Sequence, residues 1–166
     1  MAGLELAPKI MSFADAASYV QEAKRSGSKV VLTNGCFDLL HRGHVEYLEF
    51  ARQQGDVLLV AVNSDESVRQ LKGGNRPVNC AEDRMWVLAA LSSVSCVVPF
   101  ETLTPEPLVA LLQPDVYVKG GDYELEQLPE SKIVASYGGQ VVLARFVPGY
   151  STTKILQRAQ QNEVVS

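Results

Sequence analysis

The chain predicts an α/β fold: one domain with a parallel, five-stranded sheet and helices on both of its faces. Residues 56–63 (DVLLVAVN) form an uninterrupted apolar run, which is typical of a central strand in a parallel sheet. Strand, loop and helix patterns alternate along the chain, which favours βαβ units with right-handed crossovers. A length of 166 residues suits a single domain with a well-buried core.

Caps and apolar stripes mark the predicted helices. Ser12 is a candidate N-cap for the first helix, and Gly27 ends it. Asn79 is a candidate N-cap for a later helix, and Thr104-Pro105 combines a cap with proline at the first helical position. In chain order, the predicted helices are 13–25, 45–54, 65–71, 81–92, 104–112, 127–137 and 154–160.

The predicted strands lie between these helices, at 29–33, 56–63, 95–99, 114–118 and 140–144. We expect residues 1–12 to be a loose lead-in, 13–160 to be the folded domain and 161–166 to be a tail. Ligands of open α/β sheets bind beyond the carboxyl ends of the strands. The loops 33–44, 63–65 and 119–123 and the loop after residue 99 are therefore predicted to share the functional edge.

Composition excludes several classes of protein. A net charge of −4 and a pI near 5.2 argue against a nucleic-acid-binding surface, which is normally basic. No apolar run approaches the roughly 20 residues of a membrane span, and the first ten residues lack a signal-peptide pattern. Cys36, Cys80 and Cys96 are widely spaced, as expected for reduced thiols in a cytoplasmic protein.

The two histidines of the chain, His41 and His44, follow the first strand within residues 30–44 (VVLTNGCFDLLHRGH). Positions three apart share a helix face, and a helix N-terminus directs N–H groups and positive potential at one spot. Gly43 lacks a Cβ that would block a ligand from the backbone. Phosphate chemistry is therefore predicted here. The alternatives are two surface histidines and a zinc site, for which a third ligand is missing.

Further polar residues extend this phosphate hypothesis. Lys72 and Arg76 flank a glycine-containing loop that could close over a polyphosphate. For Arg76, a charge exposed to solvent on a mobile loop is the equal alternative. Residues 151–153 (STT) place hydroxyl and N–H donors at a second helix start. Cys36 is not needed as a nucleophile for phosphate transfer. Asp38 could orient a water molecule or a histidine, or form an Asx-turn.

Residues 35–44 (GCFDLLHRGH) resemble the GxFDxxHxGH signature of the nucleotidylyltransferase superfamily, whose HxGH motif lies on a Rossmann-like α/β fold. Residues 151–153 resemble its second signature, which contacts the triphosphate. Over almost the whole chain, the pattern is most similar to D-glycero-β-D-manno-heptose 1-phosphate adenylyltransferases. The resembling segments are 33–38 (TNGCFD), 71–73 (LKG), 76–77 (RP), 82–85 (EDRM), 118–123 (VKGGDY) and 148–153 (PGYSTT).

The resemblance implies that AMP passes from ATP to a heptose 1-phosphate, giving ADP-heptose and pyrophosphate for lipopolysaccharide core or related glycans. It also implies Mg²⁺ carried by the ATP phosphates and a homodimer. Since no sugar-kinase segment precedes the signature, the stand-alone form of the enzyme is expected rather than a kinase fusion.

The residues that would perform this reaction fall into three groups, and no protein side chain is expected to bind a metal. The catalytic group is His41, His44 and Lys72. The nucleotide-binding group is Thr33, Asn34, Gly35, Cys36, Phe37, Gly43, Arg84, Lys119, Gly121, Asp122, Ser151, Thr152 and Thr153. The substrate-binding group is Asp38, Asn63, Asp65, Arg76 and Tyr123.

Two alternatives stay open. One is a cytidylyltransferase acting on glycerol 3-phosphate or a similar phosphate. In that family an arginine begins the second signature, whereas this chain has Phe146 there and Arg145 one residue away. The other is a nucleotide-binding module without turnover, on the same fold.

Overall fold

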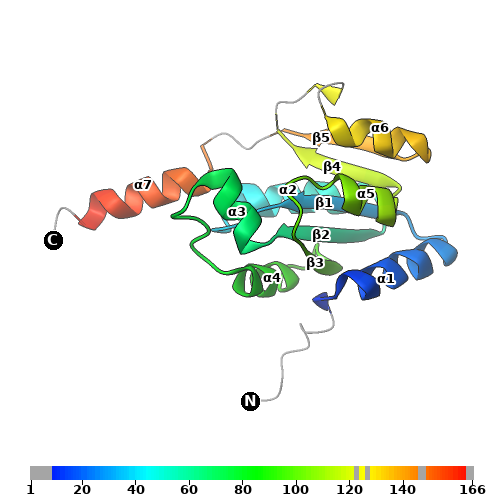
Figure 1. Ribbon diagram of the computed structural model, residues 1–166, viewed down its shortest axis with the longest axis horizontal. Helices are drawn as coiled ribbons and strands as arrows, with labels where there is room; N and C mark the ends of the chain where they lie inside the picture. Colours follow the sequence, from blue (N-terminus) through cyan, green and yellow to red (C-terminus); the bar gives the residue numbers. More distant parts are fainter. Residues whose placement is uncertain (1–8, 122–123, 126–127, 146–148, 164–166) are drawn as a thin grey trace, which may run out of the picture.

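Five parallel strands form the central sheet of the computed structural model, which describes residues 9–121, 124–125, 128–145 and 149–163 (Figure 1). The strand order is β3-β2-β1-β4-β5. The strands are β1 Val30–Gly35, β2 Val57–Asn63, β3 Cys96–Phe100, β4 Val116–Gly120 and β5 Gln140–Ala144. This architecture confirms the predicted α/β domain with a five-stranded parallel sheet.

Helices cover both faces of the sheet, and each face has its own apolar cluster. One face packs against α1 Phe13–Arg25, α5 Glu106–Leu112 and α6 Pro129–Ser136. The other packs against α2 Arg42–Arg52 and α4 Ala81–Ala89. The remaining helices are α3 Asp65–Lys72 and α7 Thr152–Glu163, and α7 extends away from the sheet on the left of Figure 1.

Successive side chains of a strand point to opposite faces of the sheet, so each strand contributes to both apolar clusters. In β1, Leu32 joins the cluster of α1, α5 and α6, while Val31 joins that of α2 and α4. Residues 58–62 of β2 are 0% exposed, because both faces of this strand are covered. Each such valine or leucine contributes roughly 1.5–3 kcal/mol on burial, which accounts for the continuous apolar run in the sequence.

Several helix ends differ from the sequence-based predictions. Helix α2 begins at Arg42 rather than at residue 45, because His41 acts as the N-cap. Helix α4 has Cys80 rather than Asn79 as its N-cap residue and ends at Ala89 rather than 92. Asn79 does not cap this helix because its side-chain amide donates instead to the backbone oxygen of Asp38, 3.2 Å away.

The two ends of the domain are also more ordered than predicted. Ile10 forms a parallel bridge with Val97, and the Met11 N–H donates to the Val97 oxygen at 2.9 Å. This lead-in segment therefore covers part of β3, an edge strand that would otherwise leave backbone groups unpaired. At the other end, α7 continues to Glu163, three residues beyond the predicted limit.

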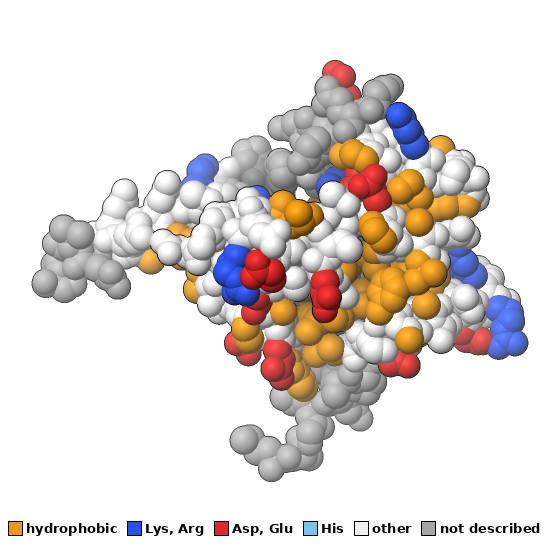
Figure 2. Space-filling model, in the orientation of Figure 1, with side chains coloured by type: hydrophobic (Ala, Val, Ile, Leu, Met, Phe, Trp, Pro, Cys, Tyr) orange, Lys and Arg blue, Asp and Glu red, His pale blue; other side chains and the backbone are white. Residues whose placement is uncertain are grey.

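The strand order reverses between β1 and β4, so the connections after these two strands diverge at their carboxyl ends. Such a reversal creates a crevice that binds ligands in open α/β sheets. On the face shown in Figure 2, positive and negative side chains are intermixed and do not form one basic stripe. Within the described residues, no helix has the length and apolar character needed to cross a bilayer.

Candidate active site

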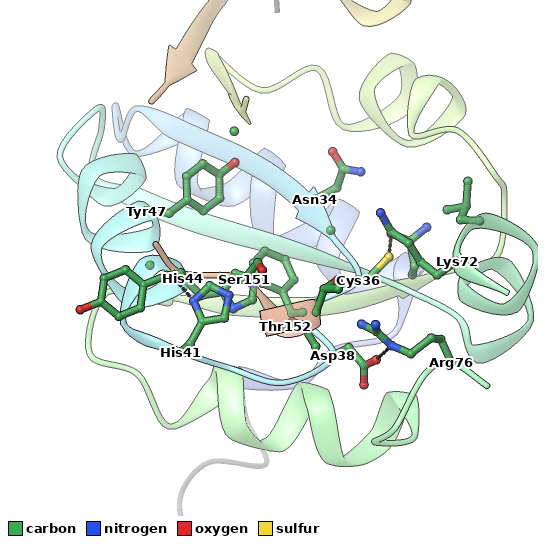
Figure 3. Close-up of a pocket in the computed structure, with 18 of the residues that line it drawn as sticks. Asn34, Cys36, Asp38, His41, His44, Tyr47, Lys72, Arg76, Ser151 and Thr152 are labelled. Carbon is green, nitrogen blue, oxygen red and sulfur yellow. Dashed lines mark hydrogen bonds and ion pairs between the residues drawn. The ribbon is translucent and has the colours of Figure 1, made fainter. Parts of the chain in front are cut away.

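A cleft of about 570 Å³ opens at the carboxyl ends of β1 and β4 (Figure 3). The loop after β1, the starts of α2 and α7, and the end of α3 all contribute to its walls. It brings together many of the residues predicted from sequence: Asn34, Gly35, Cys36, Phe37, Asp38, His41, Gly43, His44, Asn63, Lys72, Arg76, Lys119, Ser151, Thr152 and Thr153. Segments more than 100 residues apart in the chain thus meet at one site.

The two histidines stack at the start of α2. Their ring centroids lie 3.8 Å apart with an interplanar angle of 16°. Nδ1 of His41 accepts a hydrogen bond from the backbone N–H of His44 at 3.3 Å, which is how His41 caps the helix. The side chains most often found at N-caps are Ser, Thr, Asp and Asn, so a histidine in this position was not recognised from sequence.

Both histidines are neutral at physiological pH in the protein without ligand. Burial, followed by the nearby His41 ring, lowers the pKa of His44 to about 4, against a smaller opposing effect of the Leu39 backbone. Burial also lowers the pKa of His41. A neutral imidazole offers one N–H donor, and a phosphate group placed beside it would favour the protonated form.

Phe37 and Gly35 shape the loop that leads to these histidines. Phe37 has a φ of 45°, a left-handed conformation that is uncommon outside glycine. Its ring lies over Gly35, where an added Cβ would be 3.0 Å from Phe37 Cε2. The same ring contacts His44 edge-on, with centroids 5.4 Å apart. Phe37 is thus buried between the end of β1 and the histidine pair.

Gly43 makes room for side chains of the protein rather than leaving an open approach to the backbone. A Cβ at this position would be 3.1 Å from His41 Nδ1 and 3.1 Å from the Cβ of Tyr150. Tyr150 lies just before α7 and faces the His41 ring at a centroid distance of 6.3 Å. The absent Cβ therefore allows the α7 segment to pack against the start of α2.

The start of α7 forms the second helix N-terminus at the cleft. The hydroxyl oxygen of Ser151 accepts from the Lys154 N–H at 3.2 Å. Thr152 Oγ1 donates to the backbone oxygen of Leu39 at 3.3 Å, which joins α7 to the loop preceding His41. Two helix N-termini therefore face one cleft, and both favour a bound anion.

Asp38 connects the loop after β1 to the segment before α4. Its side chain, 1% exposed, pairs with Arg76 and accepts from the Val78 N–H at 2.7 Å and the Asn79 N–H at 3.1 Å. This ion pair, drawn in Figure 3, lies beside the cleft. The carboxylate therefore bonds to the segment before α4 rather than to a histidine or within an Asx-turn, and of the roles considered from sequence the orientation of a water molecule stays a prediction.

Arg84 lies beneath the site and is 1% exposed, so it does not line the cleft as a nucleotide contact would require. Its guanidinium donates to the backbone oxygens of Cys36, Asn63 (2.7 Å) and Asn79 (3.0 Å), and to the Asp65 carboxylate (2.8 Å). One side chain thus ties together the ends of β1 and β2. Asp65 is engaged in this pair and likewise does not line the cleft.

Lys72 and Cys36 both line the cleft. Within the described part of the chain, no carboxylate pairs with Lys72, so its ammonium group is available to a ligand. Burial raises the pKa of the Cys36 thiol, with a smaller opposing effect of the Lys72 charge. The thiol is therefore protonated, which disfavours a nucleophilic role as expected from sequence.

Two more predicted residues, Thr33 and Gly121, do not line the cleft. Thr33 is buried below the cleft, where its hydroxyl contacts that of Tyr47. Gly121 is buried and its N–H donates to the Ala144 oxygen at 3.1 Å. Asp122 and Tyr123 lie outside the described residues. Asn63, by contrast, faces the cleft and donates from Nδ2 to Ser67 Oγ at 3.2 Å.

The cleft also contains residues that were not among the predicted site residues. Tyr47 lines it and donates to the Val118 oxygen at 3.1 Å. Arg145 and Tyr150 line it from the segment between β5 and α7. Both stand in or next to segments that the sequence comparison named, but neither was assigned a role, and nothing in the spacing of Tyr47 distinguishes it from other residues on the buried side of α2.

The described residues contain no group of three or more His, Cys, Asp or Glu side chains arranged to hold a metal ion. Two carboxylates at or beneath the cleft form ion pairs within the protein: Asp38 with Arg76, and Asp65 with Arg84.

The histidine pair at one helix N-terminus shares the cleft with a second helix N-terminus and with Lys72, an arrangement suited to the phosphates of a nucleotide. Residues 32–158 match the family described as cytidylyltransferase-like. The chain belongs to this family, and it is a nucleotidyltransferase enzyme.

Curated relatives are similar over nearly the whole chain. The bifunctional protein HldE of Alcanivorax borkumensis is 51% identical over 154 residues, covering 93% of this chain and 32% of that protein. The bifunctional protein HldE of Cronobacter sakazakii is 53% identical over 153 residues, covering 92% of this chain and 32% of that protein. The chain thus spans about a third of the length of these relatives.

Two solved structures are also similar. A lipopolysaccharide core biosynthesis protein from Thermoplasma volcanium superimposes with a TM-score of 0.59 at 26% identity, covering 73% of this chain and 98% of that one. A pantoate–β-alanine ligase from Francisella tularensis, complexed with an ATP form and β-alanine, gives a TM-score of 0.57 at 13% identity. It covers 82% of this chain and 66% of that one, and shares the fold alone.

Proposed function

We propose that this enzyme transfers AMP from ATP to D-glycero-β-D-manno-heptose 1-phosphate, giving ADP-heptose and pyrophosphate for lipopolysaccharide core or related glycan synthesis. The observation that carries the proposal is the His41–His44 pair at the start of α2, which shares one cleft with Lys72 and the Ser-Thr-Thr segment. The heptose assignment is supported by the resemblance in six segments and by the lipopolysaccharide core protein among similar structures.

The chemistry is a single in-line displacement. An oxygen of the sugar phosphate attacks the α-phosphorus of ATP, a new P–O bond forms, and the bond to the β-phosphate oxygen breaks to release pyrophosphate. The attacking phosphate is already ionised at neutral pH, so a general base contributes little. Positioning and stabilisation of the moving negative charge supply the catalysis.

Each wall of the cleft has a proposed part in this reaction. His41 and His44 donate to the α- and β-phosphates, and the backbone around Cys36 and Phe37 holds phosphate oxygens. Lys72 neutralises the leaving pyrophosphate. The start of α7 binds the β- and γ-phosphates through Ser151, Thr152 and Thr153. Mg²⁺ enters on the ATP phosphates and offsets their charge.

The sugar phosphate is proposed to occupy the side of the cleft next to Asn63 and the Asp38–Arg76 pair. Asn63 presents a polar amide beyond the end of β2. Arg76 shares its charge with Asp38, so it would bind an acceptor phosphate more weakly than a free arginine. Asp65 would act there only through Arg84, and Tyr123 is retained as a proposed contact on the resemblance.

A pyrophosphate-release assay tests the proposal. Each of ATP and CTP is combined with D-glycero-β-D-manno-heptose 1-phosphate, its α-anomer, other sugar 1-phosphates and glycerol 3-phosphate. We expect release only with ATP and the β-heptose 1-phosphate. Preference for CTP with glycerol 3-phosphate would instead support the cytidylyltransferase alternative, for which Arg145 at the cleft would be the specific observation.

We further propose that the enzyme is a homodimer, on the strength of the same resemblance. Sedimentation equilibrium at micromolar concentration measures the mass directly. A particle of about twice 18.1 kDa is expected, and a monomer would contradict the proposal.

A further inference from the structure

We propose that Glu130 is a positioning residue of the nucleotide site: it holds Lys119 and, through Tyr117, orients Asn34 at the cleft. This inference rests on the proposed use of the cleft by ATP. Glu130 comes from the first turn of α6 and is 4% exposed, so it acts from behind the cleft wall and does not touch the nucleotide.

The network contains four side chains from three elements. Lys119 Nζ lies 3.0 Å from Glu130 Oε1 and 3.3 Å from the Tyr117 hydroxyl. The Tyr117 hydroxyl lies 2.6 Å from Asn34 Oδ1 and 3.2 Å from the same Glu130 oxygen. Asn34 and Lys119 line the cleft, whereas Tyr117 and Glu130 are buried behind it.

The number of hydrogens sets the direction of these contacts. A tyrosine hydroxyl has one hydrogen, and the shorter contact assigns it to the Asn34 amide oxygen. The Lys119 ammonium group then donates hydrogen bonds to the Glu130 carboxylate and to the Tyr117 hydroxyl oxygen. The carboxamide NH₂ of Asn34 is left to face the cleft as a donor.

The negative charge of Glu130 explains its position behind Lys119. A lysine side chain is long and flexible, and fixing it costs rotamer entropy. The buried Glu130 carboxylate offsets that cost and keeps the ammonium group at the cleft wall, where the Lys119 side chain is 21% exposed. Burial and the Glu130 charge raise the pKa of Tyr117 above its ordinary value, so its hydroxyl remains a donor.

Glu130 thereby fixes two donors at the point where the strand order reverses between β1 and β4. Lys119 lies at the end of β4 and Asn34 at the end of β1, on the two sides of that reversal, whereas the acceptor side next to Asn63 lies beyond β2. We therefore assign them to ATP rather than to the sugar phosphate. No sequence pattern pointed to Glu130, because its contact with Lys119 forms only when α6 packs on the sheet.

A double-mutant cycle read by ATP binding tests the assignment. Calorimetry with MgATP is performed on the unsubstituted chain, Glu130→Ala, Lys119→Ala and the double variant. We expect Glu130→Ala to weaken ATP about tenfold, the loss typical of one hydrogen bond to a charged group. In the Lys119→Ala background the same change should weaken ATP less than threefold, because residues in contact are not additive.

Two further variants refine the test. Glu130→Gln keeps an oxygen acceptor at the same length and should recover most of the affinity lost in Glu130→Ala. Tyr117→Phe keeps the ring, removes the link to Asn34, and should weaken ATP about threefold, an effect at the low end for a lost hydrogen bond. If Glu130→Ala does not fold, Tyr117→Phe still tests whether this network affects ATP affinity. Glu22→Gln on the exposed side of α1 is the matched acid control, with unchanged affinity.

The outcomes separate the inference from the proposed function, since ATP binding requires no acceptor. Unchanged ATP affinity in Glu130→Ala, or equal losses in both backgrounds, would overturn the inference alone. Failure of the heptose 1-phosphate to react, with the predicted coupling intact, would overturn the substrate and leave the inference standing. An unsubstituted chain that does not bind ATP would overturn both.

Discussion

His41 and His44 stack face to face, with ring centroids 3.8 Å apart, and the Nδ1 atom of His41 accepts the backbone N–H of His44. The His41 imidazole therefore caps α2 and also stacks against the His44 ring. Two protonated rings at this distance would repel each other, so the pair is neutral before a nucleotide binds. Phosphate charge placed at the rings would reverse this preference and favour protonation.

The first prediction concerns turnover. Replacing His44 or His41 by alanine removes one donor at the reacting phosphates, which typically lowers the rate by about 10²–10³. Initial rates of pyrophosphate release under saturating substrates measure the loss. Circular dichroism should show an intact fold for His44→Ala. Full activity in either variant would remove the histidines from the mechanism.

The second prediction concerns stability against pH. Unfolded His44 takes up a proton as the pH falls below about 6.5, whereas in the folded chain its pKa is lowered to about 4. Between these values the unfolded state binds more protons, so the free energy of unfolding decreases as the pH falls. The loss approaches 1.4 kcal/mol per pH unit, on the order of 3 kcal/mol in all.

Urea unfolding of the wild type and His44→Gln at pH 7, 5.5 and 4.5 measures this effect. Carboxylates titrate in both proteins, so the difference between the two isolates His44. We expect the wild type to lose more stability than the variant on acidification. Parallel curves would show that His44 does not stay neutral in the folded protein.

The third prediction separates stability from activity at Gly43. An added Cβ would meet His41 Nδ1 and Tyr150 Cβ, each at 3.1 Å, and must displace the His41 ring or the α7 segment. Alanine is favoured over glycine in a helix by roughly 1 kcal/mol, which offsets part of the steric cost. We expect Gly43→Ala to unfold near the wild-type temperature but to release pyrophosphate at least about tenfold more slowly, since small misplacements at a reacting centre are costly.

Gly74→Ala provides the matched control for this experiment. A Cβ at Gly74 would meet nothing within 4 Å, and the residue does not line the cleft. Its activity should equal that of the wild type. Equal activity of Gly43→Ala would mean that the positions of His41 and Tyr150 are less exacting than the contact distances indicate.

The fourth prediction concerns Arg84, whose guanidinium is shared by three backbone oxygens and Asp65. A lysine has no planar fork and cannot serve all four acceptors. Arg84→Lys should lower the free energy of unfolding by about 2–4 kcal/mol, somewhat less than the roughly 3–5 kcal/mol lost when one partner of a buried pair is removed, because lysine keeps the charge. Guanidinium unfolding measures this, while MgATP affinity reports the site.

A nucleotide-contacting arginine would give the opposite result in the same experiment. The variant would then keep its stability and lose ATP affinity. That outcome would restore the nucleotide-binding role that the sequence resemblance implied. Glu66→Ala, which breaks the exposed pair with Arg69, should change stability by less than about 1 kcal/mol and serves as the comparison.

Local patterns were sufficient for most of the architecture. The apolar run of β2, the cap at Ser12 and Gly27 after α1 are signals that act over a few residues, and the strands lie within two residues of their predicted bounds. The helix ends at His41 and Cys80 were missed. His41 caps α2 through its ring nitrogen, a role that histidine seldom takes, and Asn79 bonds to Asp38 in the loop after β1.

Some residues of the site could be proposed from sequence, and others needed the tertiary structure. His41, His44, Lys72 and the Ser-Thr-Thr segment could be proposed from sequence, because a helix start after a strand limits where a side chain can point. Arg84 has an ordinary helical setting in sequence, and only its burial beneath the loop after β1 gives it four acceptors. Asp38 likewise needed its partner, Arg76, 38 positions later in the chain.

By itself, the sequence determined the α/β class, the order of the elements and the phosphate chemistry of the two helix starts, since each depends on periodicity or on a short motif. Only the tertiary structure decided which basic side chains at the site pair with a carboxylate of the protein. Lys72 is free in the described part of the chain, while Arg76, Arg84 and Lys119 are paired with Asp38, Asp65 and Glu130. Ion pairs form between residues that packing brings within a few ångströms, and no spacing along a chain records that distance.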